Sequence, residues 1–81
     1  MRLDELRMIA HEFEPIENVT QSFSEVSEGI QFRLSYSKDG KKYFVVMQVM
    51  DGRDKYENVR AEVEMCFELM RDGIAQGRPC A

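Results

Sequence analysis

The chain has 81 residues, of which 43% are apolar and 32% are charged, and its net charge is −4. This length excludes two separate hydrophobic cores, and the apolar fraction excludes an intrinsically disordered chain. The charge excludes the overall basic balance that is typical of strong nucleic-acid binders. We therefore expect one small acidic domain over residues 1–75, followed by a flexible C-terminal tail at residues 76–81.

The distribution of apolar residues and cysteines predicts a cytoplasmic protein. No stretch approaches the roughly 18 apolar residues that a membrane-spanning helix needs. The first residues become acidic at Asp4 and Glu5, without an apolar signal region. Two cysteines, Cys66 and Cys80, do not make a disulfide framework.

Residues 3–14 have the spacing of an amphipathic helix. Apolar residues recur there at three- and four-residue intervals and share one face, namely Leu3, Leu6, Ile9, Ala10 and Phe13. Pro15 is expected to end this helix, because proline disfavours helical geometry at the preceding residue and offers no N–H group.

Three strands are predicted to follow. Residues 18–27 indicate a weak strand, irregular enough to include a bulge or a bend. Residues 30–37 alternate strictly, with Ile30, Phe32, Leu34 and Tyr36 on the core side. Asp39-Gly40 is typical of a tight hairpin turn, because both residue types tolerate positive φ.

The third strand, residues 42–50, is apolar on both faces. One face carries Tyr43, Val45, Met47 and Val49, and the other carries Phe44, Val46, Gln48 and Met50. Only one of these faces can pack on the helices, so the other is expected to be covered by something else.

A second, longer helix is predicted after residue 54. Asp54 is expected to cap it, with Glu57 as its capping-box partner. Its apolar stripe consists of Tyr56, Val59, Val63, Cys66, Phe67, Met70 and Ile74. Gly73 is expected to end it in the left-handed conformation.

Taken in order, these elements predict an α+β fold of the type αβββα. A three-stranded antiparallel sheet would carry both helices on one face, because neighbouring elements in sequence usually pack together.

Residues with catalytic or metal-binding chemistry do not form a recognisable site in the sequence. His11 is the single histidine and falls on the polar side of the first helix, and Cys66 belongs to an apolar stripe. Asp51, Asp54 and Glu57 are closely spaced acids, but helix capping explains Asp54 and Glu57 without a metal ion. No phosphate-binding loop, Cys-x-x-Cys pair or serine nucleophile motif occurs. We therefore expect a non-enzymatic protein without catalytic residues, metal ligands or a cofactor.

A surplus of apolar side chains is the strongest functional signal. Phe44, Val46 and Met50 lie on the second face of the third strand, and Met8, Met65 and Leu69 lie on the backs of the helices. An exposed apolar patch usually marks a protein contact. This pattern predicts a binding surface for a protein partner or a homodimer interface; alternatively, the irregular first strand or the tail folds over it.

Charged residues offer two further candidate surfaces. Carboxylates along the second helix could face a basic protein partner, namely Glu57, Glu62, Glu64, Glu68 and Asp72. The alternative is a nucleic-acid interface built from Arg33, Lys38, Lys41, Lys42, Arg53 and Lys55. Lysines at a hairpin also keep sheet edges from pairing with other chains.

The element order resembles that of the double-stranded-RNA-binding domain over nearly the whole chain. That family contacts RNA through a basic start of its second helix and through the loop between its first two strands. Here the matching residues, 54–57 and 25–29, are acidic or mixed, so no contact residue carries over.

In short length, acidic balance and element order, the chain also resembles some small phage-encoded anti-CRISPR inhibitor proteins. Those proteins occupy the DNA-binding or target-recognition surface of a nuclease. The resemblance implies a non-catalytic inhibitor whose partner is a CRISPR effector subunit.

Overall fold

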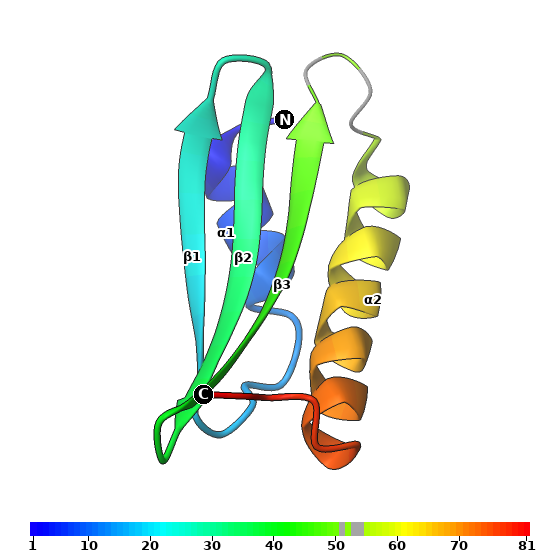
Figure 1. Ribbon diagram of the computed structural model, residues 1–81. Helices are drawn as coiled ribbons and strands as arrows, with labels where there is room; N and C mark the ends of the chain where they lie inside the picture. Colours follow the sequence, from blue (N-terminus) through cyan, green and yellow to red (C-terminus); the bar gives the residue numbers. More distant parts are fainter. Residues whose placement is uncertain (51, 53–54) are drawn as a thin grey trace.

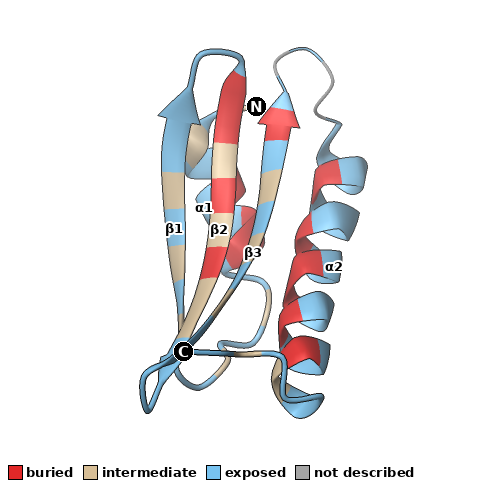
Figure 2. Cartoon of the chain, viewed as in Figure 1, coloured by how far each residue is buried: buried red, intermediate tan, exposed pale blue. Residues whose placement is uncertain are grey.

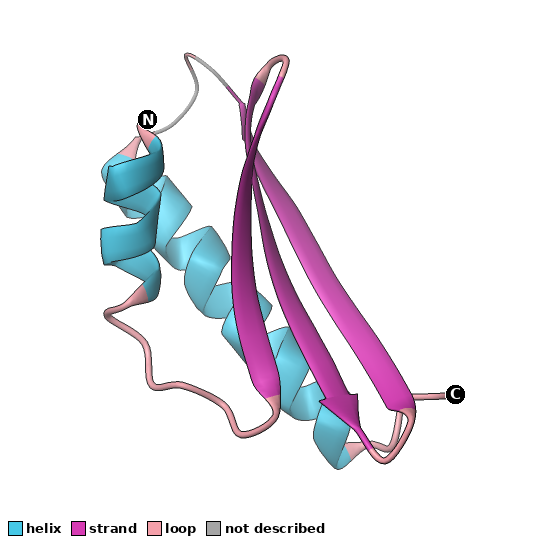
Figure 3. Ribbon diagram, turned by 90° about the vertical axis from the view of Figure 1, so that its left-hand side faces the viewer, coloured by secondary structure: helices cyan, strands magenta, loops and turns pink. Residues whose placement is uncertain are grey.

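The computed structural model describes residues 1–50, 52 and 55–81. Its elements are α1 (Leu3–Ala10), β1 (Val19–Val26), β2 (Gly29–Lys38), β3 (Lys41–Met50) and α2 (Tyr56–Ala75). The strands form one antiparallel sheet in the order β1-β2-β3. Both helices cover the same face of this sheet (Figures 1 and 3). The predicted α+β architecture is therefore confirmed.

The hydrophobic core lies between the central strand β2 and the two helices (Figure 2). Phe32 on β2, Leu6 on α1 and Phe67 on α2 are each at most 1% exposed. The Phe67 ring stacks on Phe13, with 5.3 Å between their centroids, and lies 6.3 Å from the Phe32 ring. The alternation predicted for β2 is confirmed, because Ile30, Phe32 and Leu34 are all buried.

The first helix ends earlier than predicted, at Ala10, so Pro15 does not terminate it. The His11 N–H still donates to the Arg7 carbonyl, four residues back, but the next two amides donate three residues back, Glu12 N–H to the Ile9 carbonyl at 3.1 Å and Phe13 N–H to the Ala10 carbonyl at 3.3 Å. These shorter bonds tighten the last turn. The tightened turn belongs to the segment that places the Phe13 ring against Phe67, and this tertiary packing outweighs the local helical pattern.

The first strand is regular, and the predicted bulge is wrong. Every residue from Val19 to Val26 pairs one-to-one with β2, from Tyr36 back to Gly29. A bulge would have left one residue of this run unpaired.

The ends of α2 also differ from the prediction. The helix begins at Tyr56 with Lys55 at its N-cap, and the predicted cap, Asp54, lies outside the described residues. Gly73 is helical and buried rather than a helix stop. Gly77, with φ of 73°, takes the left-handed position, and Arg78 N–H donates to the Gly73 carbonyl at 2.9 Å, as in a Schellman motif.

The tail after α2 returns to the sheet. Lys42 N–H donates to the Cys80 carbonyl at 3.0 Å, and Cys80 N–H donates to the Lys42 carbonyl at 3.2 Å. These two bonds fix one point of the tail to the hairpin end of β3. Flexibility of residues 76–81 stays a prediction.

Candidate functional site: the uncovered face of the sheet

The face of the sheet that points away from the helices is divided into a polar and an apolar part. Pairing across the strands places Thr20 beside Ser35 and Phe44, and Ser22 beside Arg33 and Val46. The β1 and β2 part is therefore rich in hydroxyl groups. The β3 part carries Phe44, Val46 and Met50, which are 46%, 50% and 38% exposed. We call these three side chains the apolar strip.

No described element covers the apolar strip. The first strand, which the sequence left as a possible cover, is fully used in pairing with β2. The described tail reaches only the hairpin end of β3, at Lys42. The surplus of apolar side chains predicted for this face is therefore exposed in the structure.

Arg33 forms the polar border of the apolar strip. Its guanidinium lies over the Phe44 ring, 4.0 Å from the centroid, in a cation–π contact. Its Nε atom is buried and has no hydrogen-bond partner among the described residues. A buried donor without an acceptor costs free energy, so this edge of the strip would gain from an acceptor brought by a partner.

A hollow of about 570 Å³ adjoins the strip at its hairpin end. It is lined by residues 18–20, by residues 35–37 and by Lys42 and Phe44. The wall is mixed, with hydroxyl groups, one ammonium group and aromatic carbon. Together with the strip it gives the face both apolar contact area and hydrogen-bonding groups.

The other apolar residues predicted at the surface lie on the helices. Met8, Met65 and Leu69 are 72%, 58% and 47% exposed. Met8 belongs to α1, whereas Met65 and Leu69 belong to α2. They are not part of the apolar strip, because the helices pack on the opposite face of the sheet.

The acidic residues of α2 are all exposed, namely Glu57, Glu62, Glu64, Glu68 and Asp72. Positions seven and four residues apart share a helix face, so Glu57, Glu64 and Glu68 form a row, with Asp72 at its end. Glu62 lies on a different side, where its charge acts on the Cys66 thiol. Glu64 also approaches Arg60 at 3.8 Å, which reduces the net charge of the row.

The structure does not bring the basic residues together. Lys38, Lys41 and Lys42 lie at the β2–β3 hairpin, whereas Lys55 precedes α2, beyond the other end of β3. A ten-residue strand such as β3 separates these ends by about 30 Å. Arg33 lies between them and is engaged with Phe44, and Arg53 is outside the described residues.

A polar cluster that sequence reasoning missed joins α2 to the segment after α1. Glu12 accepts hydrogen bonds from Arg60 Nε at 2.9 Å and from the Tyr56 hydroxyl at 3.0 Å. The hydrogen bond to the Glu12 carboxylate raises the pKa of the Tyr56 hydroxyl. Arg71 donates to the Glu14 carbonyl at 3.2 Å on the same side. These contacts join residues more than 40 positions apart, so no local pattern could have revealed them.

Residues with potential catalytic chemistry are dispersed. Cys66 is 5% exposed in the core, and burial, with a smaller contribution from the Glu62 charge, raises the pKa of its thiol to about 11. His11 and Cys80 are exposed at opposite parts of the chain. Within residues 1–50, 52 and 55–81, no group of three or more His, Cys, Asp or Glu side chains could hold a metal ion.

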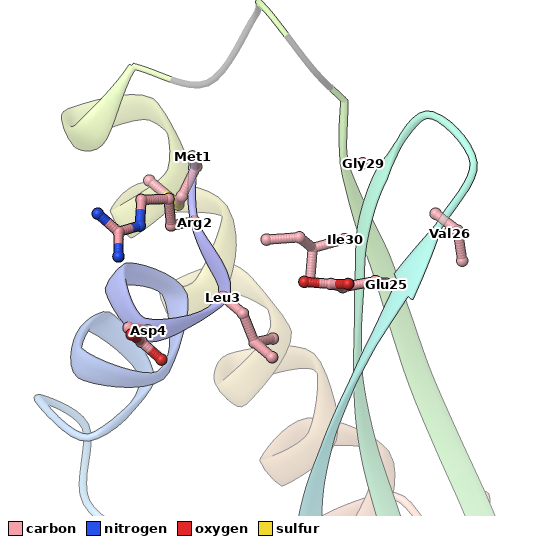
Figure 4. A pocket seen from close by; sticks show the side chains of 8 residues that line it. All are labelled: Met1, Arg2, Leu3, Asp4, Glu25, Val26, Gly29 and Ile30. Carbon is pink, nitrogen blue, oxygen red and sulfur yellow. The ribbon is translucent and has the colours of Figure 1, made fainter.

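A second hollow, of about 500 Å³, lies between the start of α1 and the β1–β2 hairpin (Figure 4). Arg2 and Asp4 lie on the helix side, and Glu25 and Ile30 lie on the strand side. No hydrogen bond or ion pair between these charged side chains is recorded in the described structure.

Neither helix in the described chain is both long and apolar enough to span a membrane. In comparisons with known proteins, the chain matches no protein-family model, no curated protein and no solved structure.

Proposed function

We propose that this chain is a non-catalytic protein-binding module, and that the uncovered sheet face with the apolar strip is its working surface. The observation that carries the proposal is the position of Phe44, Val46 and Met50 on one uncovered face, each more than a third exposed. A three-stranded sheet with helices on one side has a second face that a small chain usually makes polar. Here the β3 part of that face is mostly apolar instead, with Gln48 as the polar residue between Val46 and Met50.

The composition of the strip suits an adaptable contact. Phenylalanine supplies a large contact area, and methionine adjusts its shape to a partner. Arg33 at the border can bind a carboxylate or carbonyl group of the partner, and this hydrogen bond would orient the partner on the strip. The polar β1 and β2 part would form the rim of such an interface.

In its most specific form, the module is a phage-encoded inhibitor that acts on a bacterial CRISPR nuclease complex. Support for this form comes from size, acidic balance and element order. The exposed row of Glu57, Glu64 and Glu68 would face a basic surface of the nuclease and speed association. The row is a secondary contact in this proposal, because exposed charge pairs contribute little binding free energy.

The test is an affinity capture from nuclease-treated bacterial lysate, read by mass spectrometry. We expect one protein partner at constant stoichiometry, lost with the double variant Phe44→Ser/Val46→Ser. A matched double variant on α2, Glu64→Gln/Glu68→Gln, should retain it.

Three results would contradict the proposal in different ways. Loss of the partner with the α2 variant alone would move the working surface to the acidic row. If every captured protein disappears when the lysate is treated with nuclease, the nucleic-acid alternative is favoured. If the only protein captured is a second copy of the chain, the chain is a homodimeric adaptor.

A further inference from the structure

We infer that the free edge of β3 accepts an extended segment of the partner as a fourth strand, antiparallel to β3. This inference rests on the proposed function and adds the binding mode and the chemistry of the segment. It concerns the backbone of β3, whereas the proposed function concerns the exposed side chains.

The hairpin geometry determines which backbone groups of β3 are available. Lys38 pairs with Lys41 across the two-residue turn of Asp39 and Gly40, whose φ values are 52° and 79°. The residues that flank such a turn form a hydrogen-bonded pair, and hydrogen-bonded pairs alternate along the ladder. The odd-numbered residues of β3 therefore bond to β2, and the even-numbered residues direct their N–H and C=O groups outward.

The outward direction is confirmed by the tail. Lys42, the first outward residue, exchanges both of its backbone hydrogen bonds with Cys80. The next outward residues are Phe44, Val46, Gln48 and Met50, and the structure records no hydrogen bond from their outward groups to any described residue. Four consecutive outward residues can pair with a segment of about seven residues.

The edge of β3 also lacks the charges that normally prevent strand addition. Residues 43–50 contain no charged side chain. Lysine, proline or a bulge usually blocks an exposed edge, and all three are missing from this run. The opposite edge of the sheet differs, because Glu25 lies within β1 and the Val19 N–H is already bonded to the Ile16 carbonyl.

The helix layer leaves a supported place for a fourth strand. Figure 1 shows α2 alongside β3 and α1 behind β1 and β2. Arg60 on α2 contacts the segment after α1, and Leu69 is nine residues further, half a turn around the helix. Leu69 therefore lies on the flank away from α1, and it is 47% exposed. On the core side of β3, Val45 and Met47 are also only partly buried.

A strand added beside β3 would cover this exposed flank with one face and extend the apolar strip with the other. The same position of α2 argues against a second copy of the chain as the occupant. A symmetric pair of β3 strands about 4.8 Å apart would bring two α2 helices together, although packed helices need about 8–10 Å between axes. A single extended segment brings no helix with it.

The chemistry of the segment follows from its neighbours. Its central residues must be uncharged and apolar on both faces, without proline, to pair with Phe44–Met50 and contact Leu69. The Lys42 and Lys41 side chains lie just beyond this run, at the hairpin end, so the segment gains from a carboxylate at its end beside Phe44. In the antiparallel orientation, this carboxylate belongs to the C-terminal end of the segment.

The experiment selects displayed random decapeptides on the full chain and measures the affinity of synthetic copies. We expect uncharged, apolar sequences rich in β-branched and aromatic residues, with an acidic C-terminal end. In the protein, Val46→Pro should weaken their binding at least tenfold, because proline removes the outward N–H. The matched control, Gln21→Pro, removes an outward N–H of β1 instead, and this variant should bind the peptides with unchanged affinity. Neither proline removes a ladder bond, so both variants should fold, which circular dichroism checks.

The outcomes separate the binding mode from the proposed function. Two results would overturn strand addition. Either the selected peptides bind the Val46→Pro variant and the unchanged chain with equal affinity, or the selection yields no binding peptide. If such peptides nevertheless lose affinity with Phe44→Ser, the side chains of the open face bind without strand pairing, and the proposed function survives. Peptides insensitive to both changes would count against both proposals.

Discussion

Raising the pH should destabilise the fold through the Cys66 thiol. Burial raises the pKa of this thiol from 9.0 to about 11. The unfolded chain therefore releases the proton at lower pH than the folded chain, so the stabilisation is complete below pH 9 and is lost as pH rises toward 11. Between pH 8 and pH 10, the free energy of unfolding should fall by about 1 kcal/mol, because stability falls by roughly that much for each pH unit between the two pKa values.

Urea denaturation at both pH values measures this loss. With a slope of about 1 kcal/mol per molar for a chain of this size, the midpoint should fall by about 1 M. Other groups titrate in the same range, so the decisive quantity is the difference between the unchanged protein and Cys66→Ala. Equal midpoint shifts in the two proteins would refute the burial of an ionisable thiol in the core.

Four further substitutions test the packing and one side-chain hydrogen bond. Phe32→Ala should lower the free energy of unfolding by about 3–5 kcal/mol, whereas Phe44→Ala should lower it by about 1 kcal/mol or less. The reason is that Phe32 is 0% exposed and Phe44 is 46% exposed. Comparable losses for the two variants would contradict an uncovered sheet face. Gly29→Ala should destabilise by more than about 2 kcal/mol in thermal denaturation, because a Cβ atom there would collide with the Val49 carbonyl on β3. Glu12→Gln should lower the pKa of the Tyr56 hydroxyl in a spectrophotometric titration, because the carboxylate that raises it is removed; an unchanged titration would mean that the hydrogen bond is not formed in solution.

The sequence was most informative where one physical requirement dominated. Strict alternation in residues 30–37 left a single way to bury one face, and the structure buries that face. The Asp39-Gly40 turn was recognisable because few residues adopt positive φ readily. The double apolar character of β3 correctly indicated that the helices would cover only one of its faces.

Predictions failed where distant contacts outweighed local patterns. The helical pattern through residue 14 could not reveal that the Phe13 ring stacks on Phe67. Gly73 looked like a helix stop, but it is a contact point, where an added Cβ atom would collide with the Tyr43 ring. The outward backbone groups of β3 were likewise invisible in the sequence, because they depend on the strand order and on the pairing register.

The position of the working surface is most directly tested by photo-cross-linking in bacterial lysate. A photoreactive amino acid replaces Val46 in one protein and Glu64 in another. If the apolar strip binds the partner, the position-46 protein should cross-link to one partner in high yield, and the position-64 protein should give a much lower yield. A strong cross-link from position 64 with none from position 46 would show that α2, and not the open sheet face, contacts the partner.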